Sequence, residues 1–112
     1  MAEYLVRLPG RNYCWRAAID GGRLVTLSRA ENASTDLWLT RGLVDIQVNG
    51  YVGVQVTAES NTDEDLARCE EALASQGVVR WCPTVTTNDS QIIRASIRAL
   101  ARAIDNGVLK RV

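Results

Sequence analysis

The chain has 112 residues, enough for one small domain with a hydrophobic core. Hydrophobic residues make up 46% of it and charged residues 23%, a composition that excludes an intrinsically disordered chain. Thirteen basic residues balance thirteen acidic residues, so no net charge attracts nucleic acid or an anionic membrane, and neither partner is expected.

The first forty residues are predicted to form short strands separated by turns. Tyr4–Leu8 alternates apolar and polar residues and stops at a Pro-Gly pair. Residues 13–19 and 24–27 flank Asp20-Gly21-Gly22, whose glycines can adopt the positive φ that a tight hairpin turn requires. After a polar loop, Asp36–Leu39 is predicted to add one more short strand.

Leu43–Val48 is a nearly continuous apolar run that only Asp45 interrupts. Such a run is typical of a parallel strand that is covered on both faces. It leads into Gln47-x-Asn49-Gly50, so two side-chain amides lie at the carboxyl end of the predicted strand. Gly50 and Gly53 make the next loop conformationally permissive, which suits a loop that bends over a ligand as well as one that merely turns.

A helix is predicted to begin after Thr62, an N-cap residue followed by three acidic residues that the helix macrodipole favours. Apolar residues recur at helical spacing from Leu66 to Leu73, and Gly77 is a natural end. Val78–Cys82 is then predicted to form a second strand.

A second helix is predicted to begin at Asn88 or Asp89 and to end at Gly107. Ile93, Ile97, Leu100 and Ile104 are predicted to lie on one apolar face that is directed at a sheet edge. Val108–Val112 is predicted to open a third strand. This alternation of strands and helices predicts an α/β fold with a parallel sheet. Because two or three strands cannot bury both faces of such a sheet, some apolar surface is expected to stay exposed.

The cysteines and arginines carry little functional signal. Three widely spaced cysteines, Cys14, Cys69 and Cys82, argue against a disulfide framework and predict buried thiols in a reducing compartment. No apolar run has the length of a signal peptide or a membrane span, so a cytoplasmic location is expected. Arginines recur at every fourth position from Arg94 to Arg102 and are predicted to form a solvated face.

Two motifs accompany the predicted strands. The first, residues 42–50, contains the first strand, and the second, Cys82-Pro83-Thr84-Val85-Thr86-Thr87-Asn88, begins at the end of the second strand. Val54-Gln55 lies between the two motifs. Together they resemble the N-acetylglucosamine-6-phosphate deacetylases of the amidohydrolase superfamily. Most members of that superfamily carry His-x-His where this chain carries Gln47 and Asn49, whereas the deacetylases that bind a single metal carry Gln-x-Asn followed by Gly.

The resemblance implies that residues 1–40 are part of a small β-sandwich domain and that residues 41–112 are the first two βα units of an incomplete (β/α)8 barrel. A complete barrel usually needs about 250 residues, so the chain would be the amino-terminal portion of such an enzyme. Arg41 and Leu43 depart from the Pro and Phe that are common in the family, which affects the expected loop geometry.

The activity that the resemblance implies is hydrolysis of the N-acetyl amide of N-acetylglucosamine 6-phosphate in amino-sugar metabolism. Family members use a divalent metal, here expected to be zinc, held by one Glu and two His, and an Asp that moves a proton to the leaving amine. This chain contains no histidine, so we expect no metal and no catalytic residue in the chain alone. The resemblance further implies an amino-sugar phosphate as small-molecule partner and a homo-oligomer.

Gln47 and Asn49 are the candidate site residues, and two interpretations of them stay open. In a complete enzyme they would contact the sugar or hydrogen-bond the groups around the metal, or they would only satisfy backbone groups at the strand ends. The function also has two interpretations. The chain is either a portion of a deacetylase-like hydrolase that is inactive alone, or a non-enzymatic binding or self-assembly module derived from that fold.

Overall fold

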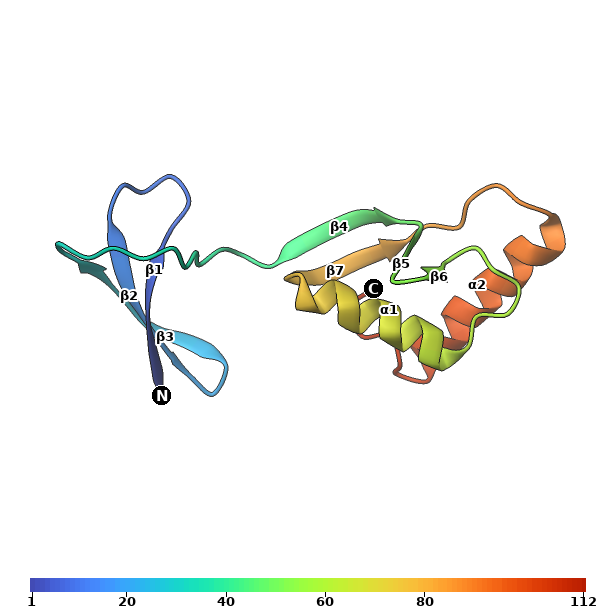
Figure 1. The fold of residues 1–112 in the computed structure, drawn as a ribbon. Coiled ribbons are helices and arrows are strands. Elements are labelled where there is room, and N and C mark those ends of the chain that lie inside the picture. The colour runs from blue at the N-terminus through green and yellow to red at the C-terminus, as the bar shows by residue number, and fades with distance from the viewer. The chain divides into compact units, whose positions relative to one another are not determined.

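The computed structural model describes residues 1–112, and the chain divides into two compact units, Met1–Arg41 and Gly42–Val112. Each unit is described by itself. The first is rich in β-structure and the second mixes strands with two helices (Figure 1). Neither helix has the length and apolar character that crossing a bilayer requires.

The first unit is an antiparallel sheet of three strands in the order β1-β2-β3. The strands are β1 (Ala2–Arg7), β2 (Cys14–Asp20) and β3 (Arg23–Ala30). Gly21 and Gly22 join β2 to β3 with φ values of 54° and 75°, which confirms the predicted hairpin turn. The third strand is longer than predicted because its pairing with β2 continues past Leu27 to Ala30.

The prediction of a strand at Asp36–Leu39 is wrong in extent, because only Trp38 pairs with another strand. A single parallel bridge joins Trp38 to Arg7, held by hydrogen bonds from Arg7 N to Leu37 O and from Leu39 N to Arg7 O, at 2.8 and 2.9 Å. No ladder forms because the contact stops after this one residue pair. Trp38 stays half exposed, with the Arg7 guanidinium 5.5 Å from its ring centroid.

The second unit confirms the predicted α/β alternation. Strand β4 (Leu43–Val48) pairs in parallel with β7 (Val78–Pro83), and α1 (Asp63–Ser75) connects them after the short strands β5 (Gly50–Tyr51) and β6 (Val54–Gln55). Helix α2 (Ser90–Asp105) follows β7. The helices lie on the same side of the β4–β7 sheet (Figure 1). Two parallel strands do not close a barrel, so the unit shows a mixed α/β fold and no (β/α)8 barrel.

The core of the second unit lies between the sheet and the two helices. Its most completely buried large side chains are those of Val56, Leu66, Cys69 and Trp81. The buried positions of α1 recur three or four residues apart, as the sequence spacing predicted. Burying a leucine or valine side chain contributes roughly 1.5–3 kcal/mol, so this cluster is the main source of stability.

Helix α1 begins as predicted. Thr62 is the N-cap, and it forms a capping box with Asp65, in which each side chain accepts a hydrogen bond from the other's backbone N–H. These bonds lower the pKa of Asp65 from its usual value, with the Thr62 backbone as the largest cause. Gln76 and Gly77 end the helix, and Gly77 has a φ of 84°.

The buried face of α2 differs from the predicted one. Ser96, Ala99, Leu100 and Ala103 are buried, whereas Ile97 and Ile104 are 52% and 46% exposed. Ser96 Oγ accepts a hydrogen bond from Ala58 N at 3.0 Å, and this contact turns the side of α2 with small residues toward the core. A larger side chain at position 96 would prevent this contact. The isoleucine face is therefore rotated toward solvent.

Arg94, Arg98 and Arg102 are exposed, as predicted for a solvated face, and Arg102 also forms an ion pair with Asp63. Its Nε donates to Asp63 Oδ1 at 2.8 Å, and Asn106 Nδ2 donates to Asp63 Oδ2 at 3.3 Å, so the carboxylate joins the start of α1 to the end of α2. Arg102 is the largest cause of a pKa for Asp63 below its ordinary value, followed by Asn106.

We expect the Asp63 contact to make stability depend on pH. Because folding lowers the pKa of Asp63, its contribution is present above the unfolded value of about 3.9 and is lost as the pH falls through the folded value. Asp63→Asn should lower the urea midpoint at neutral pH, and the gap to the wild type should close in acid. Glu64→Gln, at the exposed neighbouring position, should show no such gap. A gap that stays constant in acid would contradict this assignment.

The third strand predicted at Val108–Val112 does not form. One backbone hydrogen bond, from Trp81 N to Arg111 O at 2.9 Å, joins this segment to the edge of β7 that β4 does not occupy. The buried carboxylate of Glu70 holds the segment in place by accepting hydrogen bonds from Lys110 N and Arg111 N at 2.8 and 3.0 Å. The segment thus runs along β7 without extending the sheet.

The turn between β5 and β6 contains an unfavourable residue. Val52 and Gly53 have φ values of 46° and 80°, as both central residues of a type I′ turn require. Valine is β-branched and adopts a positive φ at a cost of order 1 kcal/mol or more, whereas Asn is well tolerated there. Val52→Asn should therefore raise the free energy of unfolding by about 1 kcal/mol in urea titration. Val52→Ala, which lacks the preference of Asn for this conformation, should raise it less, and an unchanged value for both variants would exclude strain at Val52.

Candidate functional site

The carboxyl ends of β4 and β7 meet at one edge of the parallel sheet. Thr84 N donates to Val48 O at 2.9 Å where the strands end, and Val56 N donates to Asn49 O at 2.9 Å where the β5–β6 hairpin folds back. In α/β proteins, ligands commonly bind beyond the carboxyl ends of parallel strands. The loops that leave this edge therefore contain the candidate site.

A pocket of about 540 Å³ opens at this edge, and we call it the strand-end pocket. It is lined by residues 49–51 and 53–55 together with Thr57, Thr86 and Asn88. Its size lies in the range of small-molecule sites. All of its residues belong to the second unit.

The two amides of the sequence motif do not share this pocket. Asn49 lines it, whereas Gln47 is an exposed residue of β4 that does not. The backbone N–H of Gln47 donates to Asp45 Oδ1 at 3.1 Å, a local contact within the strand. The structure therefore separates the two candidate residues, with Asn49 at the pocket and Gln47 outside it.

Sequence reasoning missed most of the pocket's other polar groups. Gln55 belongs to the Val54-Gln55 part of the motif, but no role was predicted for it, and the threonines after β7 were expected to serve strand packing. Thr57 carries no signal in the sequence. The hairpin brings it to the pocket, and only the tertiary structure shows that it faces Thr86.

The best-defined polar group of the strand-end pocket is the Thr57 hydroxyl. Thr57 is 8% exposed, and its Oγ1 accepts hydrogen bonds from Thr86 N at 2.7 Å and from Thr86 Oγ1 at 3.1 Å. The second bond joins two hydroxyls, each of which can donate or accept, so the protein itself satisfies the Thr57 hydroxyl. The side chains of Asn49 and Gln55 are exposed at this pocket.

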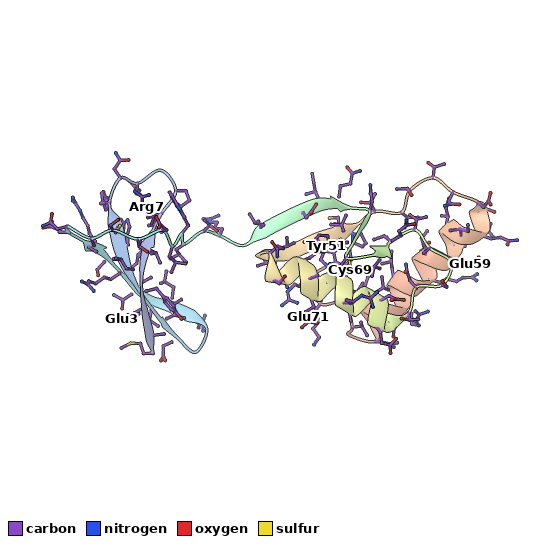
Figure 2. All side chains as sticks on the ribbon, viewed as in Figure 1. Glu3, Arg7, Tyr51, Glu59, Cys69 and Glu71 are labelled. Atoms are coloured by element: carbon purple, nitrogen blue, oxygen red, sulfur yellow. The ribbon has the colours of Figure 1, made fainter.

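Tyr51 borders the pocket beside α1, next to Cys69 (Figure 2). Cys69 is fully buried, and this burial is the largest cause of a raised pKa for its thiol, which a hydrogen bond from the Tyr51 backbone partly offsets. Cys69 therefore remains a neutral thiol and serves the core. Cys14 is also buried, but Cys82 is exposed, so the prediction of buried thiols is wrong for Cys82.

The donor set at this edge does not fit zinc. Zinc takes thiolate, imidazole and carboxylate ligands, whereas the strand-end pocket presents amides and hydroxyls. No group of three or more His, Cys, Asp or Glu residues with metal-holding geometry is present anywhere in the chain. No charged side chain lines the pocket.

Comparison with known proteins supports the fold. No family model matches the sequence, and no curated protein is significantly similar to it. Among solved structures, the chain is similar to the crystal structure of N-acetylglucosamine-6-phosphate deacetylase from Pasteurella multocida, with a TM-score of 0.56 and 20% sequence identity. The likeness covers 81% of this chain and 26% of that chain, so the chain spans about a quarter of its length. At this identity, the likeness shows that the two share a fold over the matched part.

Proposed function

We propose that the chain is the amino-terminal portion of an N-acetylglucosamine-6-phosphate deacetylase-like amide hydrolase and that it is inactive alone. The observation that carries the proposal is the pairing of β4 with β7, which brings the Gln47-x-Asn49-Gly50 motif and the Thr84–Asn88 motif to one sheet edge. The fold likeness to a deacetylase from Pasteurella multocida supports it.

In this proposal the chain supplies one wall of the substrate site, and other protein segments supply the metal ligands and the proton-transferring Asp. The donor set of the strand-end pocket agrees with that division, because its amides and hydroxyls suit a sugar and do not suit zinc. The cytoplasm and amino-sugar metabolism are the corresponding location and process.

The proposal is tested by reading the parent gene past the codon for Val112 and by assay. An in-frame His-x-Glu-Gly-Pro segment is expected, and the longer protein should release acetate from N-acetylglucosamine 6-phosphate when zinc is added. Residues 1–112 alone should release none under the same conditions. Turnover by the isolated chain, or a longer protein that folds and binds zinc without activity, would contradict the proposal.

A second candidate function is a non-enzymatic self-assembly module, and the exposure of β4 favours it. Val44 and Ile46 are 60% and 80% exposed, and one edge of β4 has no partner strand. Unpaired apolar edges promote association between chains. Light scattering should then show a discrete oligomer that Ile46→Lys dissociates. Val25→Lys, at a 55% exposed position of β3, should leave the oligomer intact. A monomeric wild-type chain would exclude this candidate.

A further inference from the structure

We propose that the isoleucine face of α2 binds a second copy of this chain, with the two α2 helices packed antiparallel about a twofold axis. The contact makes a weak homodimer. This inference goes beyond the proposed function, because it uses neither the strand-end pocket nor hydrolysis. It also assigns association to a different surface from the β4 edge, on which the second candidate function depends.

The isoleucine face is a row of apolar side chains that the core of the unit covers only in part. Ile93, Ile97, Leu100 and Ile104 follow one another at intervals of four, three and four residues, the spacing of a seam between two packed helices. Leu100 is 8% exposed, whereas Ile97 and Ile104 are 52% and 46% exposed. Helix α2 therefore presents half of a helix–helix seam to solvent.

This row is complementary to itself when two copies run in opposite directions. The midpoint between Ile93 and Ile104 is also the midpoint between Ile97 and Leu100. A twofold axis at this point places Ile93 opposite Ile104 of the second copy and Ile97 opposite Leu100 of the second copy. Each copy then supplies the same four side chains, as a symmetric interface requires.

Charge selects the antiparallel direction. Arg94 and Asp105 are both exposed, and they project from the same flank of α2 because the eleven positions between them make about three turns. Neither forms an ion pair within the chain. Antiparallel packing brings Arg94 of each copy to Asp105 of the other, which makes two ion pairs. Parallel packing would instead bring Arg94 and Arg98 against the same residues of the second copy, and like charges repel.

The first test is the association state of the 112-residue chain, measured by NMR translational diffusion up to millimolar concentration in low salt. Interfaces that bury less than about 1,200 Å² are typical of weak complexes, so we expect a dissociation constant of about 0.1–1 mM. A wild-type chain that stays monomeric throughout this range would overturn the inference.

A central substitution shows which surface associates. Ile97→Lys should weaken dimerisation by about tenfold or more, because it places a charge in the middle of the apolar contact. Val25→Lys is the matched control, since Val25 is a similarly exposed β-branched residue of β3, and it should dimerise like the wild type. A dimer that Ile46→Lys dissociates and Ile97→Lys does not would overturn this inference and support the β4 edge instead.

Exchange of charges tests the direction of the helices. Arg94→Glu and Asp105→Arg should each weaken dimerisation about tenfold, because each variant places like charges at both symmetric contacts. An equimolar mixture of the two variants should dimerise about as well as the wild type, since every contact then joins an acidic to a basic side chain. The two positions lie about 16 Å apart along one helix, so no contact within a chain explains this rescue.

A second mixture separates this geometry from general attraction between oppositely charged proteins. Arg98→Glu carries the same net charge as Arg94→Glu, but position 98 lies one turn further from Asp105 of the second copy. Its mixture with Asp105→Arg should therefore stay about tenfold weaker than the first mixture. Equal dimerisation of both mixtures would overturn the antiparallel assignment. Release of acetate by the longer protein tests the proposed function separately, and none of these outcomes changes that test.

Discussion

Glu70→Ala is expected to lower the free energy of unfolding by about 3 kcal/mol, because one buried carboxylate satisfies several otherwise unpaired donors. Glu70 is 4% exposed. It accepts from Trp81 Nε1 at 3.0 Å and from Lys110 N and Arg111 N, and the Arg111 guanidinium lies 3.7 Å away. Removing the carboxylate leaves these donors without acceptors and opens a cavity beside Trp81.

The measurement is urea unfolding followed by far-UV circular dichroism. Both helices belong to the Gly42–Val112 unit, so the helical signal reports the unfolding of that unit. Glu71→Ala is the matched control, since Glu71 is the exposed neighbour on the same helix (Figure 2). Its midpoint should stay close to that of the wild type. Equal midpoints for the two variants would mean that Glu70 does not anchor residues 108–112.

Gly50→Ala is expected to lower the free energy of unfolding by about 2 kcal/mol, the typical cost of a steric overlap in a packed region. A Cβ at this position would lie 2.2 Å from Val54 O and 3.0 Å from Gln55 Cα. Both are backbone atoms, so no side-chain rotation relieves the contact, and the β5–β6 hairpin must open. This gives a structural reason for the glycine that ends the Gln-x-Asn-Gly motif.

Urea unfolding tests the Gly50 prediction, with Asn49→Ala as the control. Asn49 is adjacent and exposed, so its truncation should change stability by less than about 0.5 kcal/mol. In NMR spectra, Gly50→Ala should shift the backbone signals of residues 49–57, whereas Asn49→Ala should shift only its nearest neighbours. A Gly50→Ala variant as stable as the control would show that the hairpin adjusts without cost.

Several elements were predictable from the sequence because their signals are local. Thr62 and Gly77 mark the ends of α1 by capping chemistry, and Gly21-Gly22 marks a hairpin because only certain residues tolerate positive φ. The apolar run at Leu43–Val48 predicted a parallel strand, and β4 pairs with β7 as a parallel sheet requires. Each of these signals depends on residues within a few positions of one another.

The errors concern contacts between residues far apart in the chain. The isoleucine face of α2 was expected to be buried, but Ser96 contacts Ala58, and this contact selects the face of small residues instead. The segment Val108–Val112 was expected to be a strand, but Glu70 holds it by hydrogen bonds that no local pattern signals. Helical periodicity identifies an apolar face, but it does not show which neighbour packs against it.

The candidate site shows the same division. The sequence by itself determined that two amides lie at the carboxyl end of β4 and that hydroxyls follow β7, because strand ends and motif order are local properties. Only the tertiary structure decided that Asn49 lines the strand-end pocket while Gln47 does not, and that Thr57 pairs with Thr86. The physical reason is that the β5–β6 hairpin folds back on the strand ends, and the positions of its side chains depend on backbone contacts between segments that are separated in sequence.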